Sequence, residues 1–176
     1  MQFIILMYRL KLANFSNAKI DEKLNEIEGS IQAISKTHEI LYSHENTNIL
    51  DSKLYFKDLL TYIEKSFDTQ KIKINLNINA ILDIEKLILC GIILNELITN
   101  ALKYAFLNQL GTINITLITK NKQHYFCIED NGIGFDYEKK KGDSFGLEFI
   151  KNIVQHELKG TFEIYYNKGT RIVIRF

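Results

Sequence analysis

Apolar residues follow a heptad spacing in the N-terminal part of the chain. The positions that alternate three and four residues apart are Ile20, Leu24, Ile27, Ile31, Ile34, His38 and Leu41. This a/d pattern predicts a helix with one narrow apolar seam. A second apolar helix is predicted over residues 2–15, truncated at its N-terminus, and a polar break at 14–17 makes the two a helical hairpin. One hairpin cannot bury both apolar faces, so we expect two copies to form a dimeric four-helix bundle.

The rest of the chain alternates between helical and strand-like patterns. Asp51 or Ser52 can cap a helix, and strict alternation over residues 71–78 predicts a strand with one solvated face. The predicted elements are, in order, a helix over 53–67, a strand over 71–78, a helix over 84–106, strands over 112–119 and 124–129, a helix over 145–158, and strands over 161–166 and 171–176. This order predicts an α+β fold, a two-layer α/β sandwich with a mixed sheet. We therefore place a helical region at residues 1–48 and the sandwich domain at residues 49–176.

Composition narrows the classes of partner and the compartment. Apolar residues make up 46% of the chain, charged residues 24%, and the formal net charge is +1. This balance does not favour a nucleic-acid partner. Cys90 and Cys127 lie inside apolar runs, as buried cysteines of a reducing compartment do. The apolar start at residues 3–7 is too short to span a bilayer and lacks a signal-peptide cleavage pattern, so we expect a cytoplasmic chain.

The predicted helix over residues 84–106 carries polar side chains on an otherwise apolar surface. Glu96 and Asn100 are four residues apart and Lys103 follows three residues later, so all three share one helical face. Carboxylate and amide oxygens suit a hard cation such as Mg²⁺, and an amine suits phosphate. The face is therefore suited to Mg²⁺ and a polyphosphate. A solvated helix face with one i, i+4 pair is the alternative.

Glycine-containing segments follow one predicted strand and open one predicted helix. Asp130-Asn131-Gly132-Ile133-Gly134 comes directly after a strand, where glycines let the backbone approach a ligand and the aspartate can accept a hydrogen bond from an exocyclic amine. A tight turn is the alternative. Ser144 and Gly146 open the last predicted helix, whose backbone N–H groups could bind an anion. Gly169-Thr170 is predicted to be part of a hairpin turn.

The order of these segments is more specific than any one of them. Glu-x-x-x-Asn with a lysine three residues on, Asp-x-Gly-x-Gly after a strand, a Gly-opened helix and Gly-Thr follow one another along the chain. This order resembles the ATP-binding domain shared by histidine kinases, gyrase, the heat-shock chaperone and mismatch-repair ATPases. The resemblance covers residues 56–176. It departs from the family pattern at Ser144, where the helix-opening box usually has a second glycine.

The resemblance implies a role for each motif residue. Asn100 is the expected Mg²⁺ ligand, and Asn95 and Glu96 beside it are the expected catalytic residues. Asp130 is expected to read the adenine amine of ATP, with help from Thr170. The other residues expected to bind or shape the ATP site are Lys103 at the phosphates, Tyr104 near the nucleotide, and Gly132, Gly134, Ser144, Gly146 and Leu147.

The N-terminal hairpin resembles the dimerisation region of bacterial two-component sensor histidine kinases, in a variant subfamily. Residues 1–6 and 38–42 carry this resemblance. In that subfamily the phosphorylated histidine lies a couple of helical turns before the position of Gln2, so the acceptor is expected upstream of residue 1. His38-Glu39 is the alternative acceptor. Because His38 lies on the predicted apolar seam, a packed histidine is the simpler interpretation of it.

Together these resemblances imply the core of a cytoplasmic sensor histidine kinase. The implied chemistry is transfer of the γ-phosphoryl group of Mg-ATP to a histidine, followed by relay to an aspartate of a response regulator. The implied partners are a second copy of the chain and a response-regulator receiver domain, and a longer parent protein could be linked to a membrane. One alternative is a nucleotide-binding scaffold without kinase activity. The other is an ATP-hydrolysing clamp of gyrase type, which the hairpin placed before the ATP domain argues against.

Overall fold

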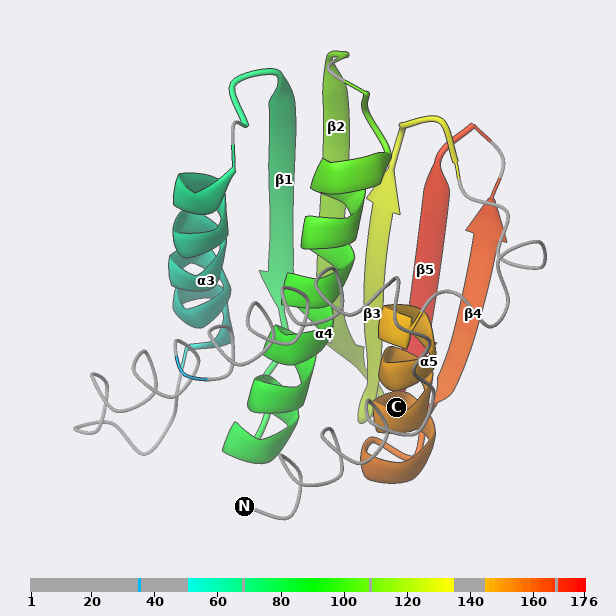
Figure 1. Ribbon diagram of the computed structural model, residues 1–176. Helices are drawn as coiled ribbons and strands as arrows, with labels where there is room; N and C mark the ends of the chain where they lie inside the picture. Colours follow the sequence, from blue (N-terminus) through cyan, green and yellow to red (C-terminus); the bar gives the residue numbers. More distant parts are fainter. Residues whose placement is uncertain (1–34, 36–50, 68, 108, 135–144, 167) are drawn as a thin grey trace.

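The computed structural model describes residues 35, 51–67, 69–107, 109–134, 145–166 and 168–176. Apart from residue 35, the predicted helical hairpin lies outside these residues. So do its dimer, residues 135–143 and Ser144. The described part of the sandwich domain consists of one sheet and the helices that pack on it (Figure 1).

A five-stranded mixed sheet forms one layer of the domain. Its strands are β1 (Ile72–Asn79), β2 (Gly111–Lys120), β3 (Gln123–Asp130), β4 (Thr161–Tyr166) and β5 (Thr170–Arg175), in the spatial order β1-β2-β3-β5-β4. β1 and β2 pair in parallel, and the other neighbouring strands pair antiparallel. A parallel pair needs a crossover connection, and here the long helix between β1 and β2 supplies it. The sheet confirms the predicted α+β class.

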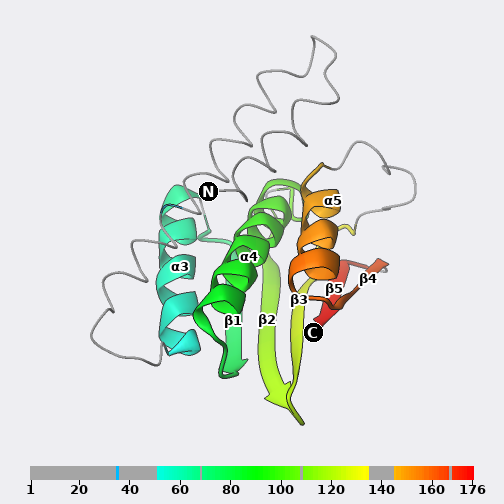
Figure 2. The ribbon, with the colours of Figure 1, turned by 90° about the horizontal axis from the view of Figure 1, so that it is seen from below.

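Three helices cover one face of the sheet and make the second layer (Figure 2). They are α3 (Ser52–Ser66), α4 (Ile84–Tyr104) and α5 (Phe145–Asn152). Asp51 caps α3 as expected, because its side chain accepts a hydrogen bond from the N–H of Lys53 at 2.8 Å. The core between the layers is built from apolar residues of both. Its fully buried large side chains include Tyr55, Phe56, Leu59, Leu87, Ile93, Ile98, Ile113, Ile115, Leu117 and Phe126.

The side of the sheet turned away from the helices is largely polar. In β1 the apolar residues at alternate positions are partly buried, and the residues between them, such as Asn75, are exposed. Asn75 donates a hydrogen bond from Nδ2 to Oδ1 of Asn114 on β2, at 2.8 Å. The predicted strand with one solvated face is therefore confirmed. The two cysteines are buried, as predicted: Cys90 in α4 and Cys127 in β3.

α4 is the central helix of the domain. Among the described helices, α4 is the one long and apolar enough to cross a membrane by length and composition, with 21 residues. More than half of its most apolar window is buried inside the domain, and Leu87, Ile93 and Leu94 are fully buried. A buried core helix passes the same test, and the burial identifies α4 as one.

The last predicted helix is only partly α-helical. α5 ends at Asn152, and a π-helical segment, η3 (Ile153–Glu157), continues the chain toward Leu158. The wider turn is closed by the N–H of Leu158, which donates to the carbonyl of Ile153 at 3.0 Å. The helix predicted over 145–158 is therefore α-helical as far as Asn152 and π-helical from Ile153 to Glu157. The apolar residues of η3 are still buried, so the same spacing suits either kind of turn.

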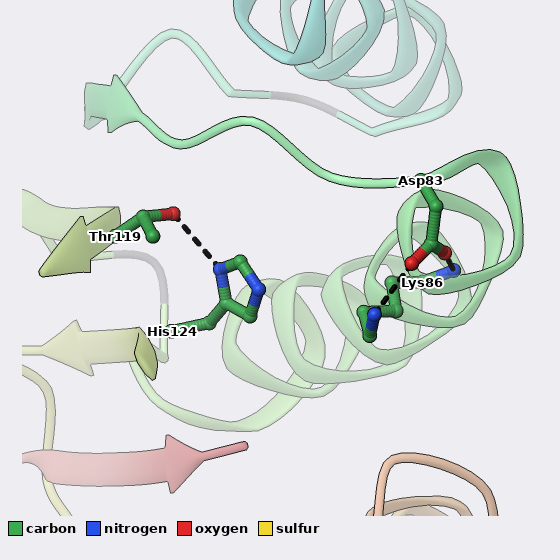
Figure 3. A network of polar contacts seen from close by, with 4 residues as sticks. All are labelled: Asp83, Lys86, Thr119 and His124. Atoms are coloured by element: carbon green, nitrogen blue, oxygen red, sulfur yellow. Dashed lines mark hydrogen bonds and ion pairs between the residues drawn. The ribbon is translucent and has the colours of Figure 1, made fainter. Parts of the chain in front are cut away.

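At the N-terminal end of α4, polar side chains form two separate contacts (Figure 3). Asp83 caps α4: its side chain accepts from the N–H of Lys86 at 2.8 Å and pairs with the Lys86 ammonium. Nearby, Thr119 Oγ1 and His124 Nδ1 lie 2.8 Å apart across the β2–β3 hairpin. Burial, and then the positive charge of Lys86, lower the pKa of His124 below its usual value. The predicted site residues of α4, Asn95 to Tyr104, lie in its C-terminal half, away from this end.

Candidate functional site

The predicted site residues gather where α4 and β3 end and where β5 and α5 begin. Glu96, Asn100 and Lys103 lie in the last turns of α4, and Asp130 is the last residue of β3. Thr170 is the first residue of β5, and Gly146 lies in the first turn of α5. In Figure 1 the ends of α4 and β3 and the start of β5 lie at the same upper end of the domain.

The polar face of α4 is formed as predicted. Asn100 donates a hydrogen bond from Nδ2 to Oε1 of Glu96 at 3.3 Å, and both residues are partly buried. Lys103 is exposed one turn further along the helix. The Asn100–Glu96 bond uses the amide nitrogen, so it does not consume the amide oxygen, which is the atom that a metal ion would need.

The start of α5 packs tightly against this face. A Cβ placed on Gly146 would overlap the Oε1 atom of Glu96 and would lie 2.9 Å from its Cδ. Glycine at this position therefore leaves the space that the Glu96 carboxylate occupies. The contact brings together two segments that lie 50 residues apart in the sequence, the middle of α4 and the first turn of α5.

Asp130 is a buried carboxylate, with 9% of the residue exposed. Its Oδ1 accepts a hydrogen bond from the N–H of Gly132 at 2.9 Å. Burial raises the pKa of Asp130 above its usual value, while hydrogen bonds from Gly132 and from the N–H and hydroxyl of Thr170 act in the opposite direction. The structure thus brings Asp130 and Thr170 together, the pair that the resemblance implied.

The backbone after Asp130 is held against the end of α4. The N–H of Ile133 donates to the carbonyl of Ala105 at 2.9 Å, and a Cβ on Gly132 would overlap that same carbonyl. Gly132 thus lies where a side chain would collide with the end of α4, and its expected approach to a ligand stays a prediction. Ala105 is a contact that the sequence pattern does not indicate.

Two glycines with positive φ angles connect this loop to the β4–β5 hairpin. Gly134 has φ of 76°, and a Cβ there would lie 3.2 Å from the carbonyl oxygen of Gly169. Gly169 has φ of 120°, and a Cβ there would overlap the carbonyl oxygen of Asp130. Both angles favour glycine. Gly169 was expected only as a turn residue, and its contact with Asp130 adds it to the site.

The remaining predicted site residues range from buried to exposed. Asn95 is buried in α4, and Leu147 is buried in the hydrophobic core, so its side chain packs between α5 and its neighbours. Tyr104 is 54% exposed in the last turn of α4. Ser144 lies outside the described residues. The site that the described structure assembles therefore rests on Glu96, Asn100, Lys103, Asp130, Thr170 and four glycines.

The side-chain oxygens of Glu96 and Asn100 suit a Mg²⁺ ion that is also bound by a nucleotide. They suit a metal ion held by protein side chains alone less well. Among the described residues, no group of three or more His, Cys, Asp or Glu side chains could hold a metal ion. Mg²⁺ usually keeps several waters and is held by one or two carboxylates plus substrate phosphates. Glu96 and Asn100 offer one carboxylate and one amide oxygen side by side, which fits that pattern.

Comparison with known families identifies the domain. The family described as "Histidine kinase-, DNA gyrase B-, and HSP90-like ATPase" matches residues 86–176, more than half of the chain. The chain belongs to this family. A second family, "Histidine kinase", matches residues 1–67 of the same chain. The two matches together place the chain among the sensor histidine kinases and identify its ATP-binding domain as that of a kinase core.

Individual relatives agree with this family. The sensor histidine kinase PdtaS of Mycobacterium tuberculosis is 22% identical over 99% of this chain, and the chain spans 36% of that protein's length. The histidine kinase domain of the Erythrobacter litoralis EL346 blue-light activated histidine kinase is similar in structure, with a TM-score of 0.73 and 17% identity over 99% of this chain and 82% of that one. The Acinetobacter baumannii histidine kinase AdeS has a TM-score of 0.56 at 18% identity, over 99% and 91% of the two chains. At these identities the structural likeness supports the kinase-core fold.

Proposed function

We propose that residues 49–176 bind Mg-ATP, with the adenine at Asp130 and the phosphates along the polar face of α4. The observation that carries this proposal is the attachment of the loop after Asp130 to the end of α4, through the hydrogen bond from Ile133 to Ala105. Glu96 lies nine residues before Ala105, roughly 13 Å back along the helix axis at 1.5 Å per residue. A base-binding carboxylate and a metal-binding face therefore lie along one elongated ligand path.

The residues have complementary tasks in this proposal. An ionised Asp130 accepts a hydrogen bond from the exocyclic amine of adenine, because a carboxylate offers acceptors only. Bound Mg²⁺ would supply positive charge that offsets the charge of the phosphates. Asn100 would hold it, with Glu96 oriented by the Asn100 amide and by the close backbone of Gly146. Lys103 contacts phosphate as a point charge.

The reaction that we propose is transfer of the γ-phosphoryl group to a histidine, with relay to an aspartate of a response regulator. Such transfer depends chiefly on positioning and on electrostatic stabilisation, which the polar face of α4 and its metal would provide. The membership of the chain in the sensor histidine kinases supports this chemistry. A cytoplasmic location, where ATP and Mg²⁺ are available, is part of the same proposal.

Residues 1–48 are proposed to form the dimerisation region, by pairing the heptad seams of two copies. The support is the spacing of apolar residues and the histidine kinase family match over residues 1–67. Replacing Ile27 and Ile31 with aspartate would bury charge in the seam and should give monomers. Light scattering on the unmodified chain and on the double variant tests this. A monomeric unmodified chain at high concentration would contradict the proposal.

Calorimetry and a labelling assay test the proposed activity together. The chain is titrated with ATP in Mg²⁺ and then incubated with γ-labelled ATP, and acid-labile phosphate is measured on the unmodified chain and on His38→Gln. ATP binding with a label that His38→Gln abolishes would identify His38 as the acceptor. Binding without any label is expected if the acceptor histidine lies outside residues 1–176 or if the domain is a nucleotide-binding scaffold. A label that persists in His38→Gln would point to another histidine of the chain. Absence of ATP binding would refute the proposed function.

A further inference from the structure

The side chain of Asn131 ends the β2–β3 ladder in an unusual way. Its backbone N–H donates to the carbonyl of Thr112 at 3.2 Å, as a normal antiparallel pair would. The return bond, from the N–H of Thr112, goes to the side-chain Oδ1 of Asn131 at 2.7 Å. We propose that Asn131 is a positioning residue that sets the orientation of Asp130 and thereby the preference for adenine. This inference rests on the proposed ATP-binding function.

The side-chain carbonyl of Asn131 takes the place that a backbone carbonyl has in a regular ladder. Asparagine is suited to this exchange because its side chain readily bonds to nearby backbone in place of a regular partner. The last residue pair of the ladder is Ile113 with Asp130, so Asn131 is the first residue beyond it. Its main-chain carbonyl is released from the sheet, and the chain can turn away directly after Asp130.

The turn that follows depends on this release. Gly132 comes next, and its N–H donates to Asp130 Oδ1 at 2.9 Å. Ile133 then donates to Ala105 at the end of α4. The Asp130 carboxylate is thus oriented by a backbone N–H whose own position is set on one side by the Asn131–Thr112 pair and on the other by α4. Loss of the Asn131 side-chain bond weakens the first of these two constraints, because only the backbone bond from Asn131 to Thr112 remains.

Base selectivity is the property that this arrangement affects. Adenine carries an amine where guanine carries a carbonyl, and a carboxylate accepts from the amine but repels the carbonyl oxygen. The discrimination requires the acceptor to be held in place, since a hydrogen bond weakens steeply with distorted geometry. A carboxylate that is free to move would bind ATP less well and would exclude GTP less strictly.

The test uses Asn131→Leu, which has a similar size and no acceptor, and Asn131→Asp, which keeps an acceptor at the same position. Dissociation constants for ATP and GTP are measured by calorimetry on the full chain. The readout is the ATP/GTP ratio of binding affinities, which is the dissociation constant for GTP divided by that for ATP. We expect Asn131→Leu to weaken ATP binding about tenfold and to reduce the ATP/GTP ratio by a similar factor. Asn131→Asp adds a charge that acts on both nucleotides alike. The ATP/GTP ratio of this variant should therefore stay within about threefold of the ratio for the unmodified chain.

Asn114→Leu is the matched control, because it removes an asparagine hydrogen bond from β2, the strand that pairs with β3, on the exposed face of the sheet. Its ATP/GTP ratio should equal that of the unmodified chain. An unchanged ratio in Asn131→Leu would overturn the inference, and so would an equal loss in Asn131→Asp and Asn131→Leu. If Asn131→Leu does not fold, the Asn131→Asp ratio decides alone: retention supports the inference and loss overturns it. An unmodified chain that binds no ATP would instead refute the proposed function.

Discussion

The two ends of the candidate site are built from different parts of the chain. The base end, around Asp130, is held mainly by backbone: Gly132 lies on the carbonyl of Ala105, and Gly169 lies on the carbonyl of Asp130. The phosphate end consists of side chains on one helix, where Glu96 and Asn100 are joined by a 3.3 Å hydrogen bond. Gly146 at the start of α5 lies against the Glu96 carboxylate.

This difference predicts different responses to substitution. A backbone carbonyl cannot move without moving its strand or helix, so a new methyl group at the base end must distort the fold. A carboxylate at the end of a flexible side chain can rotate away from a new methyl group. Changes at the base end should therefore affect stability and binding together. Changes at the phosphate end should affect binding alone.

Gly169→Ala should have the largest effect. At φ of 120° an alanine is strained, and its Cβ would overlap the carbonyl oxygen of Asp130. We expect a loss of about 3 kcal/mol or more in unfolding free energy, combining backbone strain with overpacking. Denaturant titration measures the loss, and calorimetry should show ATP binding abolished or severely weakened.

Gly134→Ala is the matched control for this variant. Its φ of 76° is also strained, but its Cβ would lie at 3.2 Å from the nearest atom, a tight contact without overlap. We expect a loss of about 1–2 kcal/mol. If the two variants were equally stable, the collision with Asp130 would not be the cause of the larger loss, and the base end would not be as rigid as its backbone contacts indicate.

Asp130→Asn should weaken nucleotide binding about 10- to 100-fold, which corresponds to about 1.5–3 kcal/mol for a hydrogen bond to a charged group. Because Asp130 contacts the base in this proposal, adenosine and ATP should weaken by the same factor. Glu129→Gln, at the exposed neighbouring position on β3, should leave both affinities within about twofold. Unchanged ATP affinity in Asp130→Asn would refute the assignment of the adenine contact.

The same variant has a predicted effect on stability. Burial raises the pKa of Asp130 in the folded protein, so folding favours the neutral carboxyl. This contribution to stability is complete below the ordinary value of 3.8 and is lost as the pH rises through the higher folded-state pKa. At neutral pH the ionised carboxylate therefore reduces stability, and Asp130→Asn should be at least as stable as the unmodified chain. Lower stability at pH 7 would show that its hydrogen bonds outweigh its burial.

The elements of the domain were predictable from sequence because their burial is periodic. The alternation over residues 71–78 appears in β1 as alternating partly buried and exposed residues. The turn at Asn121-Lys122 was also predictable, and its φ angles of 52° and 63° suit a tight hairpin. The π-helical segment after Asn152 was not predictable. Ile153 and Val154 in this segment and Leu158 directly after it are buried, and their spacing fits an α-helix equally well.

The site was predictable only in part, for a related reason. Glu96, Asn100 and Lys103 share a helical face through local spacing, which a sequence displays. The proximity of Asp130 and Thr170 came from the family resemblance. Gly169 and Ala105 contact the backbone of distant segments, and the Asn131 side chain bonds to the backbone of Thr112. Backbone atoms are the same at every residue, so the sequence gives no direct sign of them. A sequence therefore marks such contacts only by a glycine or an asparagine, which turns also require.

Gly146→Ala tests the phosphate end. A Cβ here would overlap Oε1 of Glu96, which is the far end of a flexible side chain, so the carboxylate should move and the fold should remain. Alanine is also the better helix former, by about 1 kcal/mol. We expect unchanged or higher stability, near-normal ATP affinity in EDTA, and about a tenfold loss of the affinity gained on adding Mg²⁺.

The partner variant for this test is Glu96→Gln. If Gly146→Ala acts by displacing the Glu96 carboxylate, it should have no further effect in a chain that already carries Glu96→Gln. Additive losses in the double variant would mean that Gly146 acts through another contact. A large drop in thermal stability of Gly146→Ala would contradict the view that this end of the site depends on mobile side chains.

Lys103→Gln should have the smallest effect and should separate the two ends by ligand. Lys103 is exposed at the end of α4, so solvent and salt screen its attraction to phosphate. We expect ATP affinity to fall about threefold, near 0.7 kcal/mol, with adenosine affinity and stability unchanged. The loss should shrink as salt is raised. Lys73→Gln removes the same charge from an exposed position on β1 and should leave both ligands unaffected. If Lys103→Gln weakened adenosine as much as ATP, the lysine would act on the base end, and the division of the site into a backbone-built base end and a side-chain-built phosphate end would fail.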